Sequence, residues 1–233
     1  MSTRTIPTRL AFASKKAGVG KSTQAVLVAI ALTLQGYRVG YVDGDSSSQS
    51  AFGWYEKAEA KGDPLPFAMI REPHGGIVSA THKAFEDMDL DVIIYDLQGA
   101  DVPVTMAVME DVTALIIVTT TSPFDYEHVP ACQSIAIAGL AEFDRLTPQG
   151  KPSIPLLLQF SRVDGRRSTK KIEALTEQFN KRGLDVVENY LPYRQEYEDV
   201  KNHNPVTFGT DMGPVEEIVT ELKEGGIIRG QES

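Results

Sequence analysis

Residues 14–23 read Ser-Lys-Lys-Ala-Gly-Val-Gly-Lys-Ser-Thr, and this stretch decides the fold of the chain. Its end matches the Gly-Lys-Ser of the phosphate-binding pattern G-x-x-x-x-G-K-S/T, whereas Lys15 stands in place of the first glycine. Gly18 and Gly20 still allow backbone N–H groups to turn inward and approach an anion closely. The stretch therefore predicts a phosphate-binding loop, called the P-loop below.

The segments on either side of the P-loop support this interpretation. Leu10–Ser14 is a short apolar run typical of a buried strand, and Lys21–Gln35 is an apolar helix that ends at Gly36. The helix N-terminus adds partial positive charge to the site. We expect Lys21 to contact the β- and γ-phosphates of ATP and the Ser22 hydroxyl to bind Mg²⁺. A chance Gly-Lys-Ser turn would lack this strand–loop–helix context.

Acidic residues follow two further predicted strands. Asp43 and Asp45 come after Arg38–Val42, and Asp96 ends the apolar run Val92–Tyr95. Since ligands of parallel sheets bind at the carboxyl ends of the strands, we expect these acids and the P-loop to converge. The alternative for each acid is a turn residue that caps a helix.

The remaining segments alternate between strand and helix patterns. The further strands are predicted at Leu115–Thr119, Ile154–Phe160 and Val186–Tyr190, and the helices at Gln49–Lys61, Val78–Met88, Ser168–Lys181, Glu196–Lys201 and Val215–Lys223, with one long helix to Arg145 that begins at Ser122 (N-cap) and Pro123. This alternation predicts an α/β fold, a mostly parallel twisted sheet flanked by helices on both faces. We expect residues 1–233 to form a single domain.

Composition restricts the classes of function. The chain has 233 residues, 42% of them hydrophobic, and a formal net charge of −9, so nucleic acid could bind only through a local basic patch. Cys132 is the only cysteine, which excludes an internal disulfide, argues against an iron–sulfur cluster and favours a cytoplasmic location. The longest apolar run, Ala25–Leu34, is too short to span a bilayer.

Lys16–Thr23 resembles the deviant Walker A box, K-G-G-x-G-K-S/T-T, of the ParA/MinD ATPases. Ala17 replaces the first glycine of that box. Val42–Asp45 resembles the family's D-x-D segment, although Ser46 and Ser47 stand where Pro-Gln is usual. The resemblance implies the P-loop NTPase fold of the deviant Walker A type.

The resemblance extends from residue 9 to about residue 222. Val92–Asp96 resembles the Walker B strand, and Leu115–Asp125 resembles the small plasmid-partition ATPases especially. Ser161–Asp164 and Leu191–Arg194 fall where the family contacts adenine. The resemblance thus implies nucleotide contacts from Arg162 and Pro192.

Family roles extend the assignment made from the residues. The nucleotide-binding residues of the loop would be Lys16, Ala17, Gly18, Val19, Gly20, Lys21, Ser22 and Thr23. Magnesium would be held by Ser22 with Asp43 or Asp96, and Asp45 would orient the attacking water. Lys16 would reach the phosphates of a partner subunit, which makes ATP part of a homodimer interface. Catalysis would therefore depend on Lys16, Lys21 and Asp45.

The resemblance implies a slow switch ATPase of plasmid or chromosome partition, controlled by a centromere-binding adaptor protein. A DNA-transfer accessory ATPase of the same family is one alternative, and an ATP-dependent ligase resembling dethiobiotin synthetase is another. The acidic segment Val215–Glu224 argues against a basic membrane-binding helix. The P-loop lies close to the start of the sequence, so we expect no helix-turn-helix domain before it.

One local concentration of positive charge stands out in this acidic chain. We call it the basic segment, and it consists of Arg166, Arg167, Lys170 and Lys171. In an ATP-bound dimer two copies could contact one DNA duplex without sequence preference. The alternative is a solvated helix face whose charges pair at i, i+4 spacing.

Overall fold

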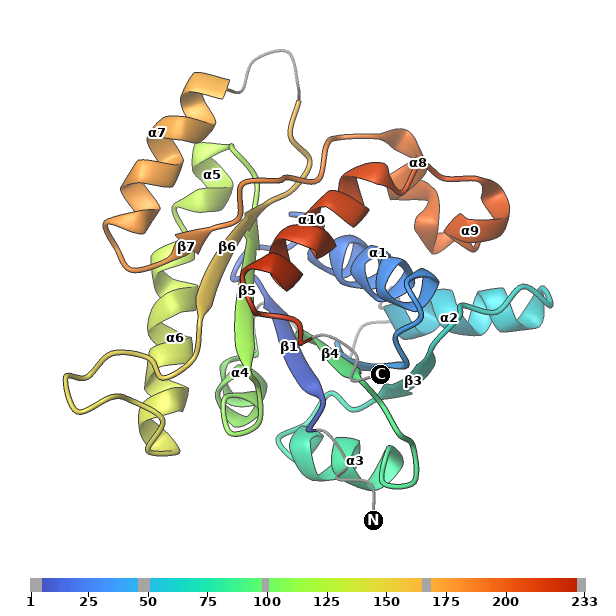
Figure 1. The fold of residues 1–233 in the computed structure, drawn as a ribbon, viewed down its shortest axis with the longest axis horizontal. Helices are drawn as coiled ribbons and strands as arrows, with labels where there is room; N and C mark the ends of the chain where they lie inside the picture. Colours follow the sequence, from blue (N-terminus) through green and yellow to red (C-terminus); the bar gives the residue numbers. More distant parts are fainter. Residues whose placement is uncertain (1–5, 46–50, 98–100, 165–168, 230–233) are drawn as a thin grey trace.

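The computed structural model describes residues 6–45, 51–97, 101–164 and 169–229. Its centre is a seven-stranded, all-parallel sheet with the order β3-β2-β4-β1-β5-β6-β7 (Figure 1). The strands are β1 (Thr8–Ala13), β2 (Val39–Gly44), β3 (Ala68–Arg71), β4 (Val92–Leu97), β5 (Ala114–Thr119), β6 (Leu156–Phe160) and β7 (Asp185–Val186). The predicted fold class, an α/β protein with a parallel sheet, is confirmed.

Helices cover both faces of the sheet (Figure 1). One face packs against α1 (Lys21–Leu34), α2 (Ala51–Ala60), α8 (Gln195–Glu198), the 3₁₀ turn η1 (Asp199–Lys201) and α10 (Gly213–Glu224). The other packs against α3 (Ile77–Ala84), α4 (Val102–Val108), α6 (Val129–Glu142) and α7 (Thr169–Asn180). Two short helices, α5 (Pro123–Tyr126) and α9 (Pro205–Phe208), complete the described part. In these described segments, no helix has the length and apolarity needed to cross a membrane.

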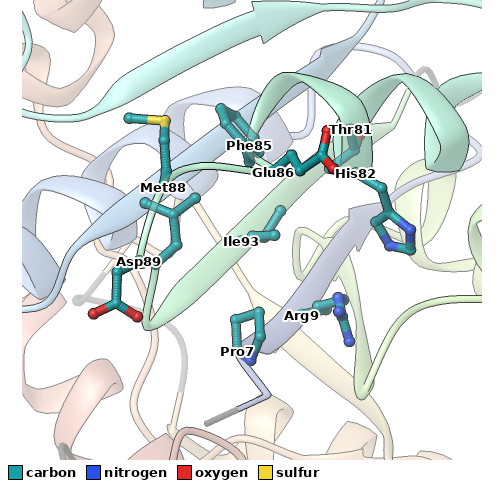
Figure 2. A pocket seen from close by; sticks show the side chains of 10 residues that line it. Pro7, Arg9, Thr81, His82, Phe85, Glu86, Met88, Asp89 and Ile93 are labelled. Carbon is teal, nitrogen blue, oxygen red and sulfur yellow. The ribbon is translucent and has the colours of Figure 1, made fainter. Parts of the chain in front are cut away.

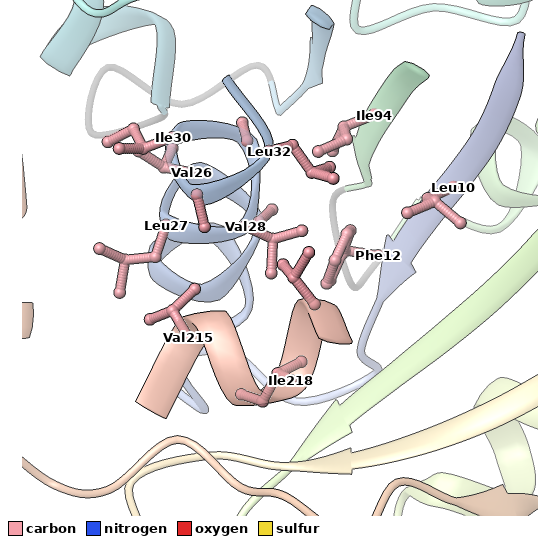
Figure 3. Packing of buried hydrophobic residues seen from close by; sticks show 14 of the residues in the cluster. Leu10, Phe12, Val26, Leu27, Val28, Ile30, Leu32, Ile94, Val215 and Ile218 are labelled. Carbon is pink, nitrogen blue, oxygen red and sulfur yellow. The ribbon is translucent and has the colours of Figure 1, made fainter. Parts of the chain in front are cut away.

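Alternation along the strands explains the two cores. Leu10 and Phe12 of β1 point to the α1 face, whereas Ala11 and Ala13 point to the opposite face. Residues 24–32 of α1 are all buried, because α1 contacts the sheet, α2 and α10 on different sides. Figure 3 shows this packing, with Val215 of α10 and Phe12 of β1 on different sides of α1. The apolar character of α1 on all sides is therefore a consequence of its central position.

Several elements differ from the sequence prediction. The long helix expected to reach Arg145 is two helices, α5 and α6, and Pro130 lies in the first turn of α6. A proline there supplies no backbone N–H to the preceding turn, so a continuous helix is disfavoured. The last strand ends at Val186 rather than Tyr190. Three short elements, β3, α4 and α9, were not predicted.

Candidate functional site

The P-loop connects β1 to α1 and turns at its two glycines. Gly18 has φ 81° and Gly20 has φ 88°, both in the left-handed region that favours glycine. In the described segments, the non-glycine residues with positive φ are Asp144 and Arg162. Ala17 therefore does not adopt a left-handed conformation. The replacement of the first glycine of the box by Ala17 therefore causes no backbone strain.

Lys21 connects the P-loop to the end of β4. Its Nζ forms an ion pair with Oδ1 of Asp96 and donates a hydrogen bond to Oγ of Ser22 at 3.1 Å. The Asp96 side chain is completely buried, and that of Lys21 is 11% exposed. The structure thus brings together Lys21, Ser22 and Asp96 in a largely water-free position.

Asp43 and Asp96 are neighbours across β2 and β4, where the two residues are paired in register. Both point to the α1 face, and both are completely buried. Oδ1 of Asp43 accepts the N–H of Asp45 at 2.9 Å, and Oδ2 accepts the N–H of Phe52 in α2 at 2.7 Å. Asp43 therefore positions Asp45 and the first turn of α2, so the helix-capping alternative describes part of its role.

Oxygen atoms at this site fit a magnesium ion. Oδ2 of Asp96 is buried and has no hydrogen-bond partner, while Lys21 Nζ contacts both Oδ1 of Asp96 and the Ser22 hydroxyl. Mg²⁺ prefers hard oxygen ligands and is often bound by one or two carboxylates together with substrate phosphates. Groups of three or more His, Cys, Asp or Glu suited to a metal are absent from the described residues. The structure thus favours Asp96 over Asp43 as the direct ligand.

A buried phenol borders the two carboxylates. Tyr41 lies one alternation before Asp43 on β2 and stacks on Phe67 at 5.5 Å between ring centroids. Burial first, and then the negative charges of Asp96 and Asp43, raise the pKa of Tyr41 well above its ordinary value. Tyr41 therefore borders the site as a neutral phenol.

Lys16 lies at the outer side of the P-loop. Its backbone N–H donates to Oγ of Ser14 at 3.1 Å, and the same hydroxyl donates to the Lys16 carbonyl at 2.8 Å. The backbone of Lys16 is thus fixed, while the residue as a whole is exposed. Val19 is buried and anchors the loop, and Thr23 is half-buried in the first turn of α1.

The two segments expected near adenine lie side by side. The N–H of Val163 donates to the Leu191 carbonyl at 3.1 Å, and the N–H of Tyr193 donates to the Val163 carbonyl at 3.0 Å. This ladder places Pro192 beside Val163 and next to Arg162. Arg162 also contacts the P-loop through the Gly18 carbonyl, at 2.5 Å from its Nη1.

Sequence reasoning did not predict the contacts that Glu198 and Ser161 make around the loop. Nε of Arg162 forms an ion pair with Oε1 of Glu198 at 3.1 Å. A Cβ atom at Gly20 would lie 2.5 Å from Oγ of Ser161. The only signal in the sequence was the adenine-side resemblance of the segment that contains Ser161 and Arg162.

Part of the predicted DNA-binding surface is outside the described residues. Arg166 and Arg167 fall there, as do Ser46 and Ser47. Lys170 and Lys171 are exposed in the first turn of α7. At the other end of α7, Lys181 forms an i, i+4 ion pair with Glu177 at 2.6 Å. This ion pair is of the kind that the solvated-face alternative predicts. Both interpretations of this helix therefore stay open.

A separate cavity of about 210 Å³ lies at the amino ends of β1 and β4 (Figure 2). Figure 2 shows Pro7 and Arg9 of the β1 end, Ile93 of β4 and Phe85 after α3 around it. The P-loop follows the opposite end of β1. This cavity therefore cannot bring a small substrate to the phosphates.

Comparisons with known proteins agree with this fold. Residues 10–206 match the CbiA family, described as the CobQ/CobB/MinD/ParA nucleotide binding domain. A curated relative, an iron-sulfur cluster carrier protein of Pseudomonas fragi, is 32% identical over 140 residues. That match covers 48% of this chain and 49% of the relative, so the chain spans about half the length of the curated relative.

Solved structures share the fold at low sequence identity. A putative plasmid partition protein of Borrelia burgdorferi B31, bound to AMPPNP, has a TM-score of 0.69 and 18% identity, over 94% of this chain and 100% of that chain. The structure of pNOB8 ParA bound to nonspecific DNA has a TM-score of 0.63 and 15% identity, over 94% of this chain and 99% of that chain. At these identities the likeness shows the fold.

Proposed function

Because the chain belongs to the CobQ/CobB/MinD/ParA family of nucleotide-binding domains, we propose that it is an ATP-dependent switch ATPase of plasmid or chromosome partition. It binds ATP with Mg²⁺ and hydrolyses ATP slowly under the control of a partner protein. The whole chain acts as a single ATPase domain. The observation that carries the proposal is the convergence of Lys21, Ser22 and Asp96 at the carboxyl ends of the central strands.

Each residue has a task that follows from its environment. Lys21 exchanges part of its contact with Asp96 for the β- and γ-phosphate oxygens, which are also anionic. Asp96 and Ser22 hold Mg²⁺, which when bound neutralises charge on the phosphates. Asp43 fixes the position of Asp45 through the Asp45 N–H, and Asp45 orients the attacking water.

Exposure of Lys16 supports the dimer part of the proposal. A lysine buried in its own subunit could not contact a second one, whereas Lys16 is exposed at the rim of the loop. In the proposed ATP state two subunits face each other across the nucleotides, and Lys16 of each contacts the phosphates of the other. A centromere-binding adaptor then stimulates hydrolysis and returns the dimer to monomers.

We propose that the ATP-bound dimer binds DNA without sequence preference through the basic segment. Support comes from the exposure of Lys170 and Lys171 on α7 and from a fold neighbour, pNOB8 ParA, whose structure contains nonspecific DNA. Counterion release would make this affinity fall steeply with salt.

Light scattering after size-exclusion chromatography, with and without ATP–Mg²⁺, tests the proposal. We expect a monomer without nucleotide and a dimer with ATP, together with slow turnover of ATP by the purified protein. An unchanged oligomer with rapid small-molecule turnover would instead indicate a ligase resembling dethiobiotin synthetase. The cavity at the amino ends of β1 and β4 shares no lining residue with the P-loop, so it does not favour the ligase.

A further inference from the structure

Arg162 connects the P-loop to Glu198, the last residue of α8. Its Nη1 donates to the Gly18 carbonyl at 2.5 Å, and its Nε is 3.1 Å from Oε1 of Glu198. The guanidinium carbon lies 5.6 Å from the ring centroid of Tyr193, within the range of a cation–π contact. Three groups, one from the P-loop and two from residues 193–198, thus hold one side chain.

The contact of Arg162 with the Gly18 carbonyl affects the part of the loop that binds phosphate. The described chain contains no cis peptide bond, and in a trans peptide the C=O and the following N–H point in opposite directions. A hydrogen bond that fixes the Gly18 carbonyl therefore also fixes the direction of the Val19 N–H. Backbone N–H groups of this loop are the groups that cradle phosphates. Because glycine has no side chain to restrict its rotation, an outside contact contributes most there.

The residue before Arg162 supports the same part of the loop. Ser161 is completely buried, its hydroxyl has no hydrogen-bond partner, and it occupies the space that a Cβ at Gly20 would need. Arg162 itself adopts φ 55°, a conformation that costs energy for a residue with a side chain. The chain thus accepts local strain to place Ser161 and Arg162 against the two glycines.

We propose that Glu198 is a positioning residue that holds Arg162 against the P-loop and so keeps the loop in its phosphate-binding form. The proposal rests on the proposed function for the identity of the ligand, ATP. Coulomb's law alone gives Glu198 the opposite effect, because a carboxylate near a phosphate site repels the ligand. Whether a substitution of Glu198 weakens or strengthens ATP binding therefore separates the two possibilities.

The first test is Glu198→Gln, which keeps the size of the side chain and removes its charge. We expect the affinity for a non-hydrolysable ATP analogue, measured by calorimetry, to fall about three- to tenfold. The matched control is Glu196→Gln in the same helix, since Glu196 pairs with Arg194 at 3.2 Å and has a similar side-chain exposure, 31% against 30%. We expect no change in the control. Unchanged or tighter binding by Glu198→Gln would overturn the proposal.

A second variant, Arg162→Lys, keeps the positive charge but cannot contact Gly18 and Glu198 with separate nitrogen atoms. We expect a similar loss of affinity, and the double variant should lose no more than Arg162→Lys alone. Losses that add in full would mean that Glu198 acts independently of Arg162, which contradicts the proposal.

Hydrogen exchange without nucleotide separates this inference from the proposed function. We expect faster amide exchange in residues 15–22 of both Glu198→Gln and Arg162→Lys, and parental exchange in Glu196→Gln. If the parent fails to bind ATP, the proposed function is wrong, and the exchange result still decides whether Glu198 positions the loop. Parental exchange in Glu198→Gln would refute that role.

Discussion

Replacing Lys21 by alanine perturbs the site in two ways that can be measured separately. The variant loses the charge expected to contact phosphate, and it leaves Asp96 as a buried carboxylate without its cation. Removal of one partner of a buried ion pair costs about 3–5 kcal/mol. Because the Lys21 side chain retains 11% exposure, we expect the lower end, about 3 kcal/mol in the free energy of unfolding. For a chain of this size that corresponds to a melting temperature lower by about 6–12 °C.

A double variant distinguishes the structural effect from the effect on ligand binding. Asp96→Asn added to Lys21→Ala removes the uncompensated charge, so much of the lost stability should return. ATP binding should not return, since neither the lysine nor the proposed metal ligand is present. In Lys21→Ala alone we expect turnover to fall by about 10²–10³-fold, as for loss of one preorganised charge-stabilising group.

Urea unfolding without nucleotide measures the stability, and calorimetry with a non-hydrolysable ATP analogue measures the affinity. Lys151→Ala, which removes an exposed lysine before β6, is the control for loss of one positive charge. Parental affinity together with parental turnover in Lys21→Ala would refute the assignment of the site. Parental stability would refute the inferred energetic role of the ion pair.

Three further predictions concern the switch itself. Lys16→Ala should bind ATP as a monomer but lose the ATP-dependent dimer in light scattering, and a normal dimer would make Lys16 an ordinary loop residue. Asp45→Ala should bind ATP and accumulate as a long-lived dimer, because phosphate contacts remain while water orientation fails; phosphate release at the parental rate would contradict this role. Replacing the basic segment by glutamate should abolish binding of random duplex DNA in fluorescence anisotropy and leave ATP hydrolysis unchanged, whereas a parent that binds no DNA even at low salt must use another surface.

The sequence was sufficient to predict the fold class and to place the P-loop near the acidic residues of β2 and β4. Both followed from one geometric rule, that the carboxyl ends of parallel strands lie at one edge of the sheet. Asp43 of β2 and Asp96 of β4 are paired in register, and β4 pairs directly with β1, the strand that leads into the P-loop. This arrangement follows from that rule. The prediction needed only approximate ends for β2 and β4, and the apolar runs that end at Val42 and Tyr95 stop close to the observed ends, Gly44 and Leu97.

Other features depended on information that a linear pattern does not contain. The break between α5 and α6 had a local signal in Pro130, but the apolar pattern on both sides favoured one helix. The contact of Arg162 with Gly18 links positions 144 residues apart, and it requires a left-handed backbone at an arginine. Residue type gives no indication of such a conformation, because it is set by the surrounding tertiary structure.

The two strand-end acids show most clearly why position in a pattern does not determine a role. Asp43 and Asp96 are each the second-to-last residue of a β-strand and are both buried, yet their oxygens have different partners. Backbone N–H groups occupy both oxygens of Asp43, so any movement of Asp43 would also release Asp45 and the start of α2. Asp96 has a lysine on one oxygen and no hydrogen-bond partner on the other. A ligand that brings a cation to the site would satisfy Asp96 without disturbing Asp43, so metal binding and positioning of Asp45 can be assigned to different carboxylates.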